Sequence, residues 1–209
     1  MILKDRKEAG EKLALKLKEF KDTESIVYAL PRGGVVVAHE IAKNLNLPLS
    51  LVITRKIGSQ FNSEYAICSV AEDGHSVCNE QEEKDADQEW LKEEFEKEKK
   101  EAKRRREVYL ENDQVLSPKN KTAIIVDDGI ATGLTIKLAI KEIKHEGPAR
   151  IIVAVPVAPF DTISKIQGEV DRVVALEIDR DYLGAVGEYY EYFPQIEDEE
   201  VIRIMSEYK

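Results

Sequence analysis

The sequence is poor in cysteine, with only Cys68 and Cys78 among its 209 residues. A framework of several disulfides is therefore excluded, and we expect a reducing, cytoplasmic setting. The two cysteines stand ten positions apart without cysteine companions, which disfavours a zinc site. No stretch is apolar and long enough to cross a membrane, and residues 1–5 lack the apolar core of a signal peptide. We therefore expect no membrane partner.

Basic residues are also in short supply, because 31 lysines and arginines face 41 acidic residues. The net charge of -10 and the pI near 5.0 disfavour a general nucleic-acid binder, which needs a basic face. They do not exclude a small anionic ligand, because backbone N–H groups and a few cations can bind phosphate. The G-x-x-x-x-G-K-[ST] loop of the P-loop nucleotidases is absent, so that class is excluded.

Residues 122–135 are the most informative part of the sequence. A short apolar run, residues 123–126, has the composition of a buried strand and ends at Asp127 and Asp128. Gly129 and Gly133 follow, and a helical pattern then begins. Its apolar residues recur at i, i+3, i+4 and i+7, namely Ile136, Ala139, Ile140 and Ile143. The predicted order is strand, acidic pair, glycine-containing loop and helix N-terminus.

This order suits a ligand that carries both a vicinal diol and a phosphate. A helix N-terminus attracts anions through its free N–H groups and dipole, and glycines let several N–H groups point inward. Thr132 and Thr135 can cap the helix or donate to phosphate. Asp127 and Asp128 would lie at a strand's carboxyl end, where open α/β sheets bind ligands, and carboxylates accept hydrogen bonds from a diol. An ordinary turn with a local aspartate cap is the alternative for any single residue, and the combination favours the phosphate site.

A second unit of the same kind precedes the first. Residues 25–30 have the pattern of a buried strand, and Pro31, Arg32, Gly33 and Gly34 follow them. A helical pattern then places apolar residues at i, i+4 and i+8, namely Val37, Ile41 and Leu45. Glycines let the main chain approach a ligand closely, and an arginine offers a planar fork of donors to phosphate. A plain turn with a solvated arginine is the alternative.

A third segment begins with a predicted strand over residues 49–54. Arg55 and Lys56 follow it, and a polar stretch then continues to Tyr65 before a new strand near residues 66–71. Adjacent basic residues at the end of a strand are often mere surface charge. Here the polar stretch after them indicates a loop.

The segment at about 79–113 is crowded with glutamate, lysine and arginine, and it contains no glycine or proline. Trp90, Leu91 and Phe95 give it a short apolar patch. We predict one long, mostly solvated helix inserted between core strands and supported by charge pairs at i, i+4. The basic residues 104–106 suit a helix C-terminus, and this interpretation is favoured over a contact with nucleic acid or a partner.

Strand and helix patterns alternate through most of the chain, which predicts an α/β fold with a largely parallel sheet. Two more core strands are expected at 151–155 and 172–178, and helices near each end of the chain. Their helical residues are Leu13, Leu17 and Phe20 at the start and residues 197–208 at the end. The length suits one domain with a full core, so we predict a single domain over residues 1–209.

The 122–135 segment resembles the 5-phosphoribosyl-1-pyrophosphate (PRPP) signature of the type I phosphoribosyltransferases. That signature has four apolar residues, two acids, and a loop that ends in Thr-Gly-x-Thr. The resemblance implies that the two acids hold the ribose hydroxyls while residues 130–135 wrap the 5-phosphate. The PRPP-binding residues that it implies are Asp127, Asp128, Gly129, Ile130, Ala131, Thr132, Gly133 and Thr135. The segment of Arg32, Gly33 and Gly34 is similar to the family's pyrophosphate loop, whose backbone N–H groups would bind the leaving group.

The stretch from Arg55 resembles the flexible loop that closes over PRPP, especially the Arg-Lys-x-Gly start and later Glu-Tyr of adenine phosphoribosyltransferases. It implies that Arg55 and Lys56 neutralise the departing pyrophosphate, and that Glu64 donates or accepts a proton at the nucleophile. A C-terminal hood, at about residues 179–209, would cover that nucleophile. Tyr182 or Val186 would then pack against a planar base.

Nearly the whole chain resembles a bacterial and archaeal group of type I phosphoribosyltransferases. The marks are the Arg-Gly-Gly loop, the charged insertion and an Ala-Val-Gly-x-x-Tyr-x-x-Phe hood. The resemblance implies a central, mostly parallel sheet flanked by helices, and transfer of a 5-phosphoribosyl group from PRPP to a nitrogenous base with release of pyrophosphate. Mg²⁺ is the implied cofactor. It is coordinated mainly by phosphate oxygens and water, so no residue is assigned to it. Related enzymes are commonly homodimers.

One position departs from the pattern of the hypoxanthine–guanine enzymes. They carry an aspartate three residues after the second acid, and Ala131 stands there in this chain. A 6-oxopurine substrate is therefore in doubt, and the acceptor base is open. The alternative function is a regulatory protein that senses PRPP or a nucleotide without catalysis. The sequence shows no helix-turn-helix or broad basic face, which such a regulator would need to act on nucleic acid.

Overall fold

The computed structural model describes residues 1–111 and 115–208, and of Glu64 only the main chain. Its centre is a parallel sheet with the strand order β2-β1-β6-β7-β8. The strands are β1 (Ser25–Ala29), β2 (Leu49–Leu51), β6 (Thr122–Val126), β7 (Arg150–Pro159) and β8 (Arg172–Asp179). The predicted α/β architecture with a central parallel sheet is confirmed.

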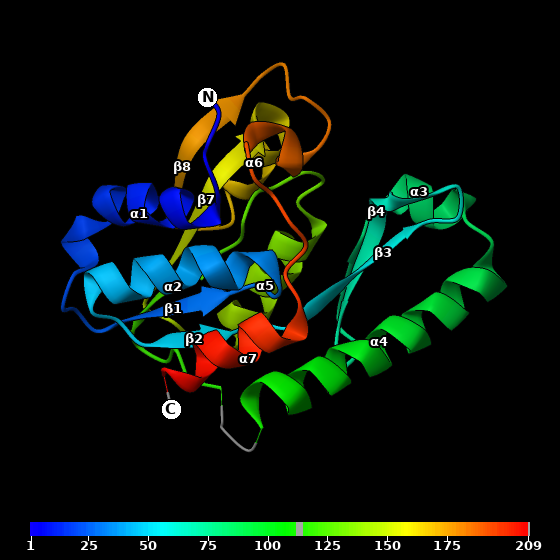
Figure 1. The fold of residues 1–209 in the computed structure, drawn as a ribbon. Coiled ribbons are helices and arrows are strands. Elements are labelled where there is room, and N and C mark those ends of the chain that lie inside the picture. Colours follow the sequence, from blue (N-terminus) through cyan, green and yellow to red (C-terminus); the bar gives the residue numbers. More distant parts are fainter. Residues whose placement is uncertain (112–114, 209) are drawn as a thin grey trace.

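Helices cover both faces of this sheet (Figure 1). Successive side chains of a strand point to opposite faces, so Val27 and Ala29 pack toward α1 (Arg6–Lys16), α2 (Gly33–Leu45) and α7 (Asp198–Ser206). Ile26 and Tyr28 pack toward α5 (Leu134–His145) and α6 (Phe160–Ile166). Every residue of β1 and β6 is buried, which explains the run of apolar residues after Ser25 and Thr122.

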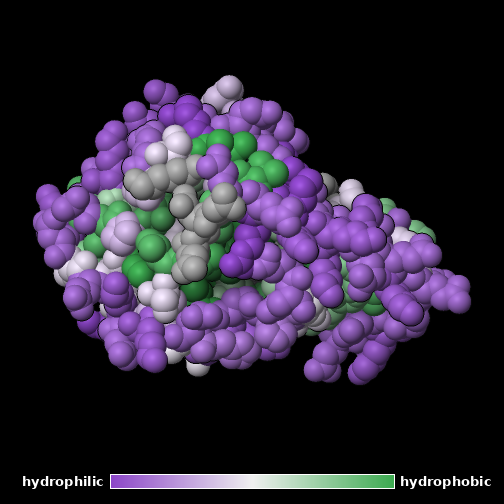
Figure 2. Space-filling model, turned by 90° about the horizontal axis from the view of Figure 1, so that it is seen from below, coloured by the Kyte–Doolittle hydropathy of each residue, from purple (hydrophilic) through white to green (hydrophobic). Residues whose placement is uncertain are grey.

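A smaller unit projects to one side of the core (Figure 1). It is an antiparallel sheet of β3 (Thr54–Ser59), β4 (Asn62–Ala71) and β5 (Ser76–Cys78), with α3 (Glu80–Asp85) and α4 (Gln88–Leu110) against it. Ile57, Ile67 and Leu91 belong to its own apolar cluster. Seen from below, the surface of this projecting unit is predominantly hydrophilic (Figure 2).

The predictions for the segment before and within this unit need correction. The strand expected over residues 49–54 is two strands, because the chain leaves the parallel sheet after Leu51 and joins the small sheet at Thr54. The segment expected as a loop after Arg55 is a β-hairpin instead, in which β3 pairs with β4. The hairpin lies outside the central sheet, and among the described side chains of residues 55–65 only Ile57 is buried, so the polar sequence of this stretch concealed the strands.

The single helix predicted for residues 79–113 was wrong, because the insertion contains two helices. The helical backbone is interrupted at Asp87, which has extended backbone angles. Its carboxylate accepts a hydrogen bond from the Trp90 N–H at 2.9 Å, so Asp87 is the N-cap of α4. Helix α4 is also less solvated than expected, since its residues Ala102 and Tyr109 belong to the main core. Residues 112 and 113 of the predicted helix lie outside the described residues.

The cysteine prediction also needs correction, because Cys68 and Cys78 form a disulfide. They are directly opposed in the β4–β5 pair, so the register of two strands brings together cysteines that are separated by 10 positions in sequence. The argument for a reducing setting, which rested on the scarcity of cysteine, is weakened because the two cysteines of the chain are paired.

The N-terminus is tied to the C-terminal hood. The Leu3 N–H donates to the Tyr189 carbonyl at 2.8 Å, and the Glu191 N–H donates to the Leu3 carbonyl at 2.7 Å. The hood contains the short helix η2 (Val186–Tyr189) and runs to α7, which occupies most of the predicted terminal helix. Residue 209 of the predicted hood lies outside the described residues.

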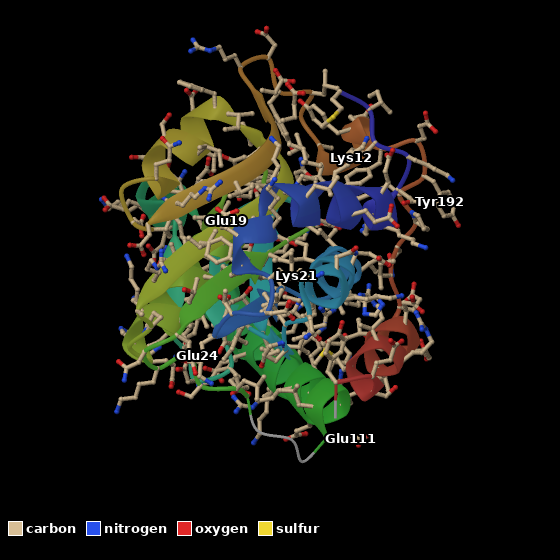
Figure 3. All side chains as sticks on the ribbon, turned by 90° about the vertical axis from the view of Figure 1, so that its left-hand side faces the viewer. Lys12, Glu19, Lys21, Glu24, Glu111 and Tyr192 are labelled. Atoms are coloured by element: carbon tan, nitrogen blue, oxygen red, sulfur yellow. A yellow bond between two sulfur atoms is a disulfide. The ribbon has the colours of Figure 1, made fainter. Side chains whose placement is uncertain are left out.

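Charges of both signs spread over the outer face of α1 and the segment after it, which includes the short helix η1 (Lys18–Phe20). Figure 3 labels Lys12, Glu19, Lys21 and Glu24 on this face. Among the described residues, no helix is both long and apolar enough to span a membrane.

Candidate functional site

The site lies where the connections of the parallel sheet change direction. From β1 the chain crosses to β2 on one side, whereas β6, β7 and β8 follow one another on the other side. Adjacent strands β1 and β6 therefore flank a switch point, where open α/β sheets bind ligands at the strands' carboxyl ends. β1 leads there into the segment Pro31–Gly34, and β6 leads into Asp127 and Asp128.

The two glycines after β1 lie directly against the acidic pair. A Cβ at Gly33 would come within 1.9 Å of the Asp128 Oδ2, and a Cβ at Gly34 within 2.9 Å of the Asp127 Cα. Both distances are shorter than van der Waals contact, so only glycine fits at these two positions. The predicted pyrophosphate loop and the predicted diol-binding acids are thus brought together. The peptide bond between Pro31 and Arg32 is cis.

Asp128 is held by two residues from opposite ends of the chain, Arg6 and Tyr190. The Arg6 Nε donates to the Asp128 Oδ2 at 2.7 Å, and the side chains of the pair are only 8% and 17% exposed. The Tyr190 hydroxyl donates to the Asp128 backbone carbonyl at 2.7 Å. The Arg6 guanidinium also lies 3.6 Å from the centre of the Phe193 ring and donates to the Pro194 carbonyl at 2.8 Å.

Asp127 lacks such a partner in the described structure. Its Oδ1 accepts a hydrogen bond from the Asp128 N–H at 2.9 Å. Burial raises the pKa of Asp127 well above its ordinary value, and the negative charge of Asp128 raises it further. Burial likewise raises the pKa of the Tyr190 hydroxyl, with the nearby Asp128 as the next cause. The acidic pair is therefore asymmetric, with one carboxylate neutralised by arginine and the other short of positive charge.

Two helix N-termini face this pair without side-chain caps. Helix α2 begins after Arg32, and α5 begins after Gly133, whose φ of 79° is the left-handed conformation that favours glycine. By contrast, α1, α3 and α4 begin with side-chain caps from Asp5, Asn79 and Asp87, while α6 and α7 have none. Thr132 and Thr135 do not cap α5, so the first N–H groups of that helix are left for an anion.

The residues gathered here line one cavity of about 530 Å³, a volume typical of small-molecule sites. Of the sequence-predicted residues it is lined by Arg32, Gly33, Arg55, Lys56, Asp127, Asp128, Gly129, Ala131, Thr132, Gly133, Thr135 and Val186. Ile130 departs from the prediction, because its side chain is buried and its N–H donates to the Val157 carbonyl at 2.8 Å. Gly34 contacts the acidic pair from behind rather than lining the cavity.

Two of the predicted cations around the cavity, Arg32 and Arg55, already have acidic neighbours. The Arg32 Nη1 lies 3.1 Å from Glu197 and 3.5 Å from Asp198, at the start of α7. The Arg55 Nε donates to the Glu98 Oε2 at 2.7 Å. Lys56 is exposed at the cavity wall. The side chain of Glu64, the predicted proton donor or acceptor, lies outside the described residues.

On the hood side, only one of the two predicted base contacts faces the cavity. Val186 lines it, whereas Tyr182 stacks on Tyr189 with ring centres 5.5 Å apart. The Tyr182 hydroxyl is buried, without a hydrogen-bond partner among the described residues, and burial raises its pKa to about 12. The Tyr182 ring thus packs within the hood's own core, and its contact with a base stays a prediction.

Several cavity residues were not found from the sequence. They include Arg6, Arg105, Phe193, Gln195 and Ile196. No local pattern marks Arg6, because it is one charged residue on a charged helix. Phe193 belongs to the Ala-Val-Gly-x-x-Tyr-x-x-Phe hood motif. That motif is the signal from which a position near the acidic pair could have been predicted for it.

The basic run in the insertion has partners within the chain. Arg104 pairs with Glu101 and Asp198, Arg105 with Glu101, and Arg106 with Glu72. The favoured helix interpretation of these arginines is consistent with these pairs.

Comparison with known proteins places these features in a family. The phosphoribosyl transferase domain matches residues 2–192. A Mycobacterium tuberculosis protein of strains CDC 1551 and H37Rv, provisionally named a phosphoribosyl transferase, is 35% identical over 207 residues. This match covers 98% of the chain and 46% of the relative. The chain therefore spans about half the length of the curated relatives it matches.

Solved structures give the same result for the fold. The crystal structure of TT1426 from Thermus thermophilus has a TM-score of 0.80 and 36% identity, covering 100% of this chain and 99% of that chain. A Neisseria gonorrhoeae hypothetical protein with bound ppGpp has a TM-score of 0.52 at 14% identity, covering 100% of this chain and 99% of its own. A hypoxanthine phosphoribosyltransferase of Staphylococcus aureus has a TM-score of 0.50 at 12% identity, covering 96% of this chain and 92% of its own. The last two similarities concern the fold alone.

Proposed function

Because this chain belongs to the phosphoribosyl transferase domain family, we propose that it transfers a 5-phosphoribosyl group from PRPP to a nitrogenous base. The observation that carries the proposal is the meeting of the acidic pair, the glycines after β1 and the uncapped start of α5 in one cavity. These groups match the three parts of PRPP: a diol, a pyrophosphate and a 5-phosphate.

In the proposed reaction, the bond between the anomeric carbon and the pyrophosphate oxygen breaks, and pyrophosphate leaves with the electron pair. A bond from a ring nitrogen of the base to that carbon forms, and the nitrogen gives up its proton. The N–H groups at the start of α5 bind the 5-phosphate, and those of Arg32 to Gly34 bind the leaving group. Arg55 and Lys56 stand at the cavity wall, where positive charge stabilises the pyrophosphate as its charge grows.

The acidic pair fits a partner that brings hydroxyl donors or positive charge. Asp127 is short of positive charge and has a raised pKa, and carboxylate oxygens are ligands that Mg²⁺ accepts. Asp127 and Asp128 are thus the residues that would hold a magnesium ion bound together with PRPP. When bound, Mg²⁺ would neutralise negative charge on the pyrophosphate.

The acceptor base is left open by the residues around it. Ala131 lines the cavity and offers no side-chain group to bind or move a proton. We propose Val186 as an apolar contact of the base and Glu64 as the residue that exchanges a proton with the nucleophile. We also propose that the chain is a single domain and that the protein is a cytoplasmic homodimer. Light scattering of the purified protein tests the oligomeric state.

A sensor without catalysis is the second candidate. It is favoured by the ion pairs that already engage Arg32 and Arg55, since catalysis would need these side chains to turn to pyrophosphate. The similarly folded Neisseria gonorrhoeae protein with bound ppGpp suggests the nucleotide to try as a ligand.

One experiment separates the two candidates. The protein is incubated with PRPP, Mg²⁺ and each of a panel of purine and pyrimidine bases, and pyrophosphate release is followed. We expect release with at least one base, and loss of release when Asp127→Asn is combined with Asp128→Asn. Tight PRPP or ppGpp binding, without release for any base, would favour the sensor instead.

A further inference from the structure

Two of the three histidines in the chain meet far from the cavity. His75 lies in the turn between β4 and β5, whereas Glu142 and His145 lie one turn apart near the end of α5. Their ligand atoms all lie within 4.8 Å of one another. The rings of His75 and His145 are 5.5 Å apart between centres, in an edge-to-face arrangement. One imidazole from the β4–β5 turn and an imidazole and a carboxylate from α5 are thus directed to one point.

A fourth potential ligand adjoins this group. The His75 Nδ1 lies 2.9 Å from the Glu142 Oε1 and 3.1 Å from the Asp73 Oδ2. One ring nitrogen carries at most one proton, so it can serve only one of these two carboxylates fully. Asp73 is itself held in place, because its Oδ1 accepts a hydrogen bond from the His75 N–H at 2.9 Å. The cluster therefore gathers two carboxylates around a nitrogen that cannot satisfy both.

We propose that Asp73, His75, Glu142 and His145 bind a divalent transition-metal ion of the zinc type. Imidazole nitrogens and carboxylate oxygens are its usual protein ligands, at about 2.0–2.2 Å, so neighbouring ligand atoms of a tetrahedral site lie about 3.4 Å apart. The group is within reach of this spacing, because His75 and His145 are exposed and their rings can move toward the ion. Two carboxylates also balance the two positive charges of the ion.

The position of the cluster gives the metal a structural role. It joins the β4–β5 turn of the projecting unit to α5 of the core. The PRPP loop lies at the opposite end of α5, a helix of 12 residues, and therefore about 17 Å away. The ion would hold one end of the β4–β5 hairpin, whose other end carries the Cys68–Cys78 disulfide. It is thus separate from the proposed magnesium ion.

Zinc binding to the tag-free, full-length chain tests the proposal. Isothermal titration without reductant keeps the cysteines paired, and we expect one Zn²⁺ per chain. His145→Gln and His75→Gln should each weaken the affinity by at least tenfold. Lys144→Gln, an exposed neighbour on the same helix, is the matched control and should bind as the wild type does. Circular dichroism checks that each variant is folded.

Two further measurements sharpen the result. Co²⁺ in place of Zn²⁺ should give visible absorption bands that are lost in His145→Gln, and the double variant Asp127→Asn, Asp128→Asn should retain zinc binding. Absence of saturable binding, or equal affinity in wild type and both histidine variants, would overturn the proposal. Binding that disappears with the acidic pair but survives in His145→Gln would place the metal in the cavity and overturn it as well.

Discussion

Replacement of Arg6 by glutamine should reveal how strongly the acidic pair depends on the N-terminal helix. Arg6 is nearly buried, and it makes a 2.7 Å ion pair with Asp128, a hydrogen bond to the Pro194 carbonyl and a close contact with the Phe193 ring. Glutamine keeps part of the side-chain stem but removes the charge. The Asp128 carboxylate would then lie beside Asp127 without its cation.

The expected cost follows from these contacts. A hydrogen bond to a charged group contributes about 1.5–3 kcal/mol, and a cation over an aromatic ring contributes about 0.5–2 kcal/mol. Breaking a fully buried pair costs about 3–5 kcal/mol, but Asp128 retains 17% of its side-chain exposure and water can partly replace the arginine. We therefore expect Arg6→Gln to lower the free energy of unfolding by about 3 kcal/mol.

Urea unfolding followed by circular dichroism measures this change. The matched control is Arg203→Gln, whose pair with Glu200 is 59% and 41% exposed and should contribute less than about 0.5 kcal/mol. A double-mutant cycle with Asp128→Asn should give a coupling energy of at least about 1 kcal/mol, because the two residues share one interaction. If Arg6→Gln and Arg203→Gln unfold at the same urea concentration, Arg6 does not support the acidic pair as we reason.

Three other predictions concern the same elements. Gly34→Ala should weaken PRPP binding at least tenfold in titration calorimetry. The added Cβ would lie 3.0 Å from the Val126 carbonyl oxygen, and the backbone of a buried strand cannot easily shift to make room. Wild-type affinity in this variant would contradict the close fit. A carboxyl with a higher pKa in the folded than in the unfolded protein holds its proton more tightly when folded. The contribution of Asp127 to stability therefore declines as the pH rises from its ordinary pKa of 3.8 through the raised value. Asp127→Asn should thus gain stability relative to wild type across that range in urea unfolding, and a constant difference would argue against the raised pKa. Finally, the denatured, unreduced protein should show no reactive thiol, and reduction should destabilise the small sheet by about 2–3 kcal/mol in hydrogen exchange; two titratable thiols would exclude the Cys68–Cys78 disulfide.

The parts of the fold that the sequence predicted are those with a local cause. β1 and β6 are buried along their whole length and are apolar after their first residues, Ser25 and Thr122, and the residues after both strands differ sharply from them. Both loops could therefore be placed at strand ends before any pairing was known. Their meeting then followed from the rule that parallel strands bind ligands at their carboxyl ends.

The parts that escaped prediction depend on contacts between distant segments. Arg6 and Asp128 are separated by 122 positions, and nothing near either residue indicates the pair. The disulfide depends on the register of β4 and β5, which the sequence leaves open. The break before α4 is different, because Asp87 was a readable cap signal that the charge pattern of the insertion obscured.

The asymmetry of the acidic pair connects the fold with the proposed function. The two ends of the chain meet at Asp128, where Arg6 neutralises its carboxylate and Tyr190 binds its main chain. Asp127 receives no such cation in the described structure and bears a raised pKa. A ligand that brings hydroxyl donors or a divalent cation would supply the donors or positive charge that the Asp127 carboxylate lacks in the folded protein. The pair thus combines one carboxylate fixed by the fold with one left ready for a ligand, and this is the division expected where part of the stability is given up for binding.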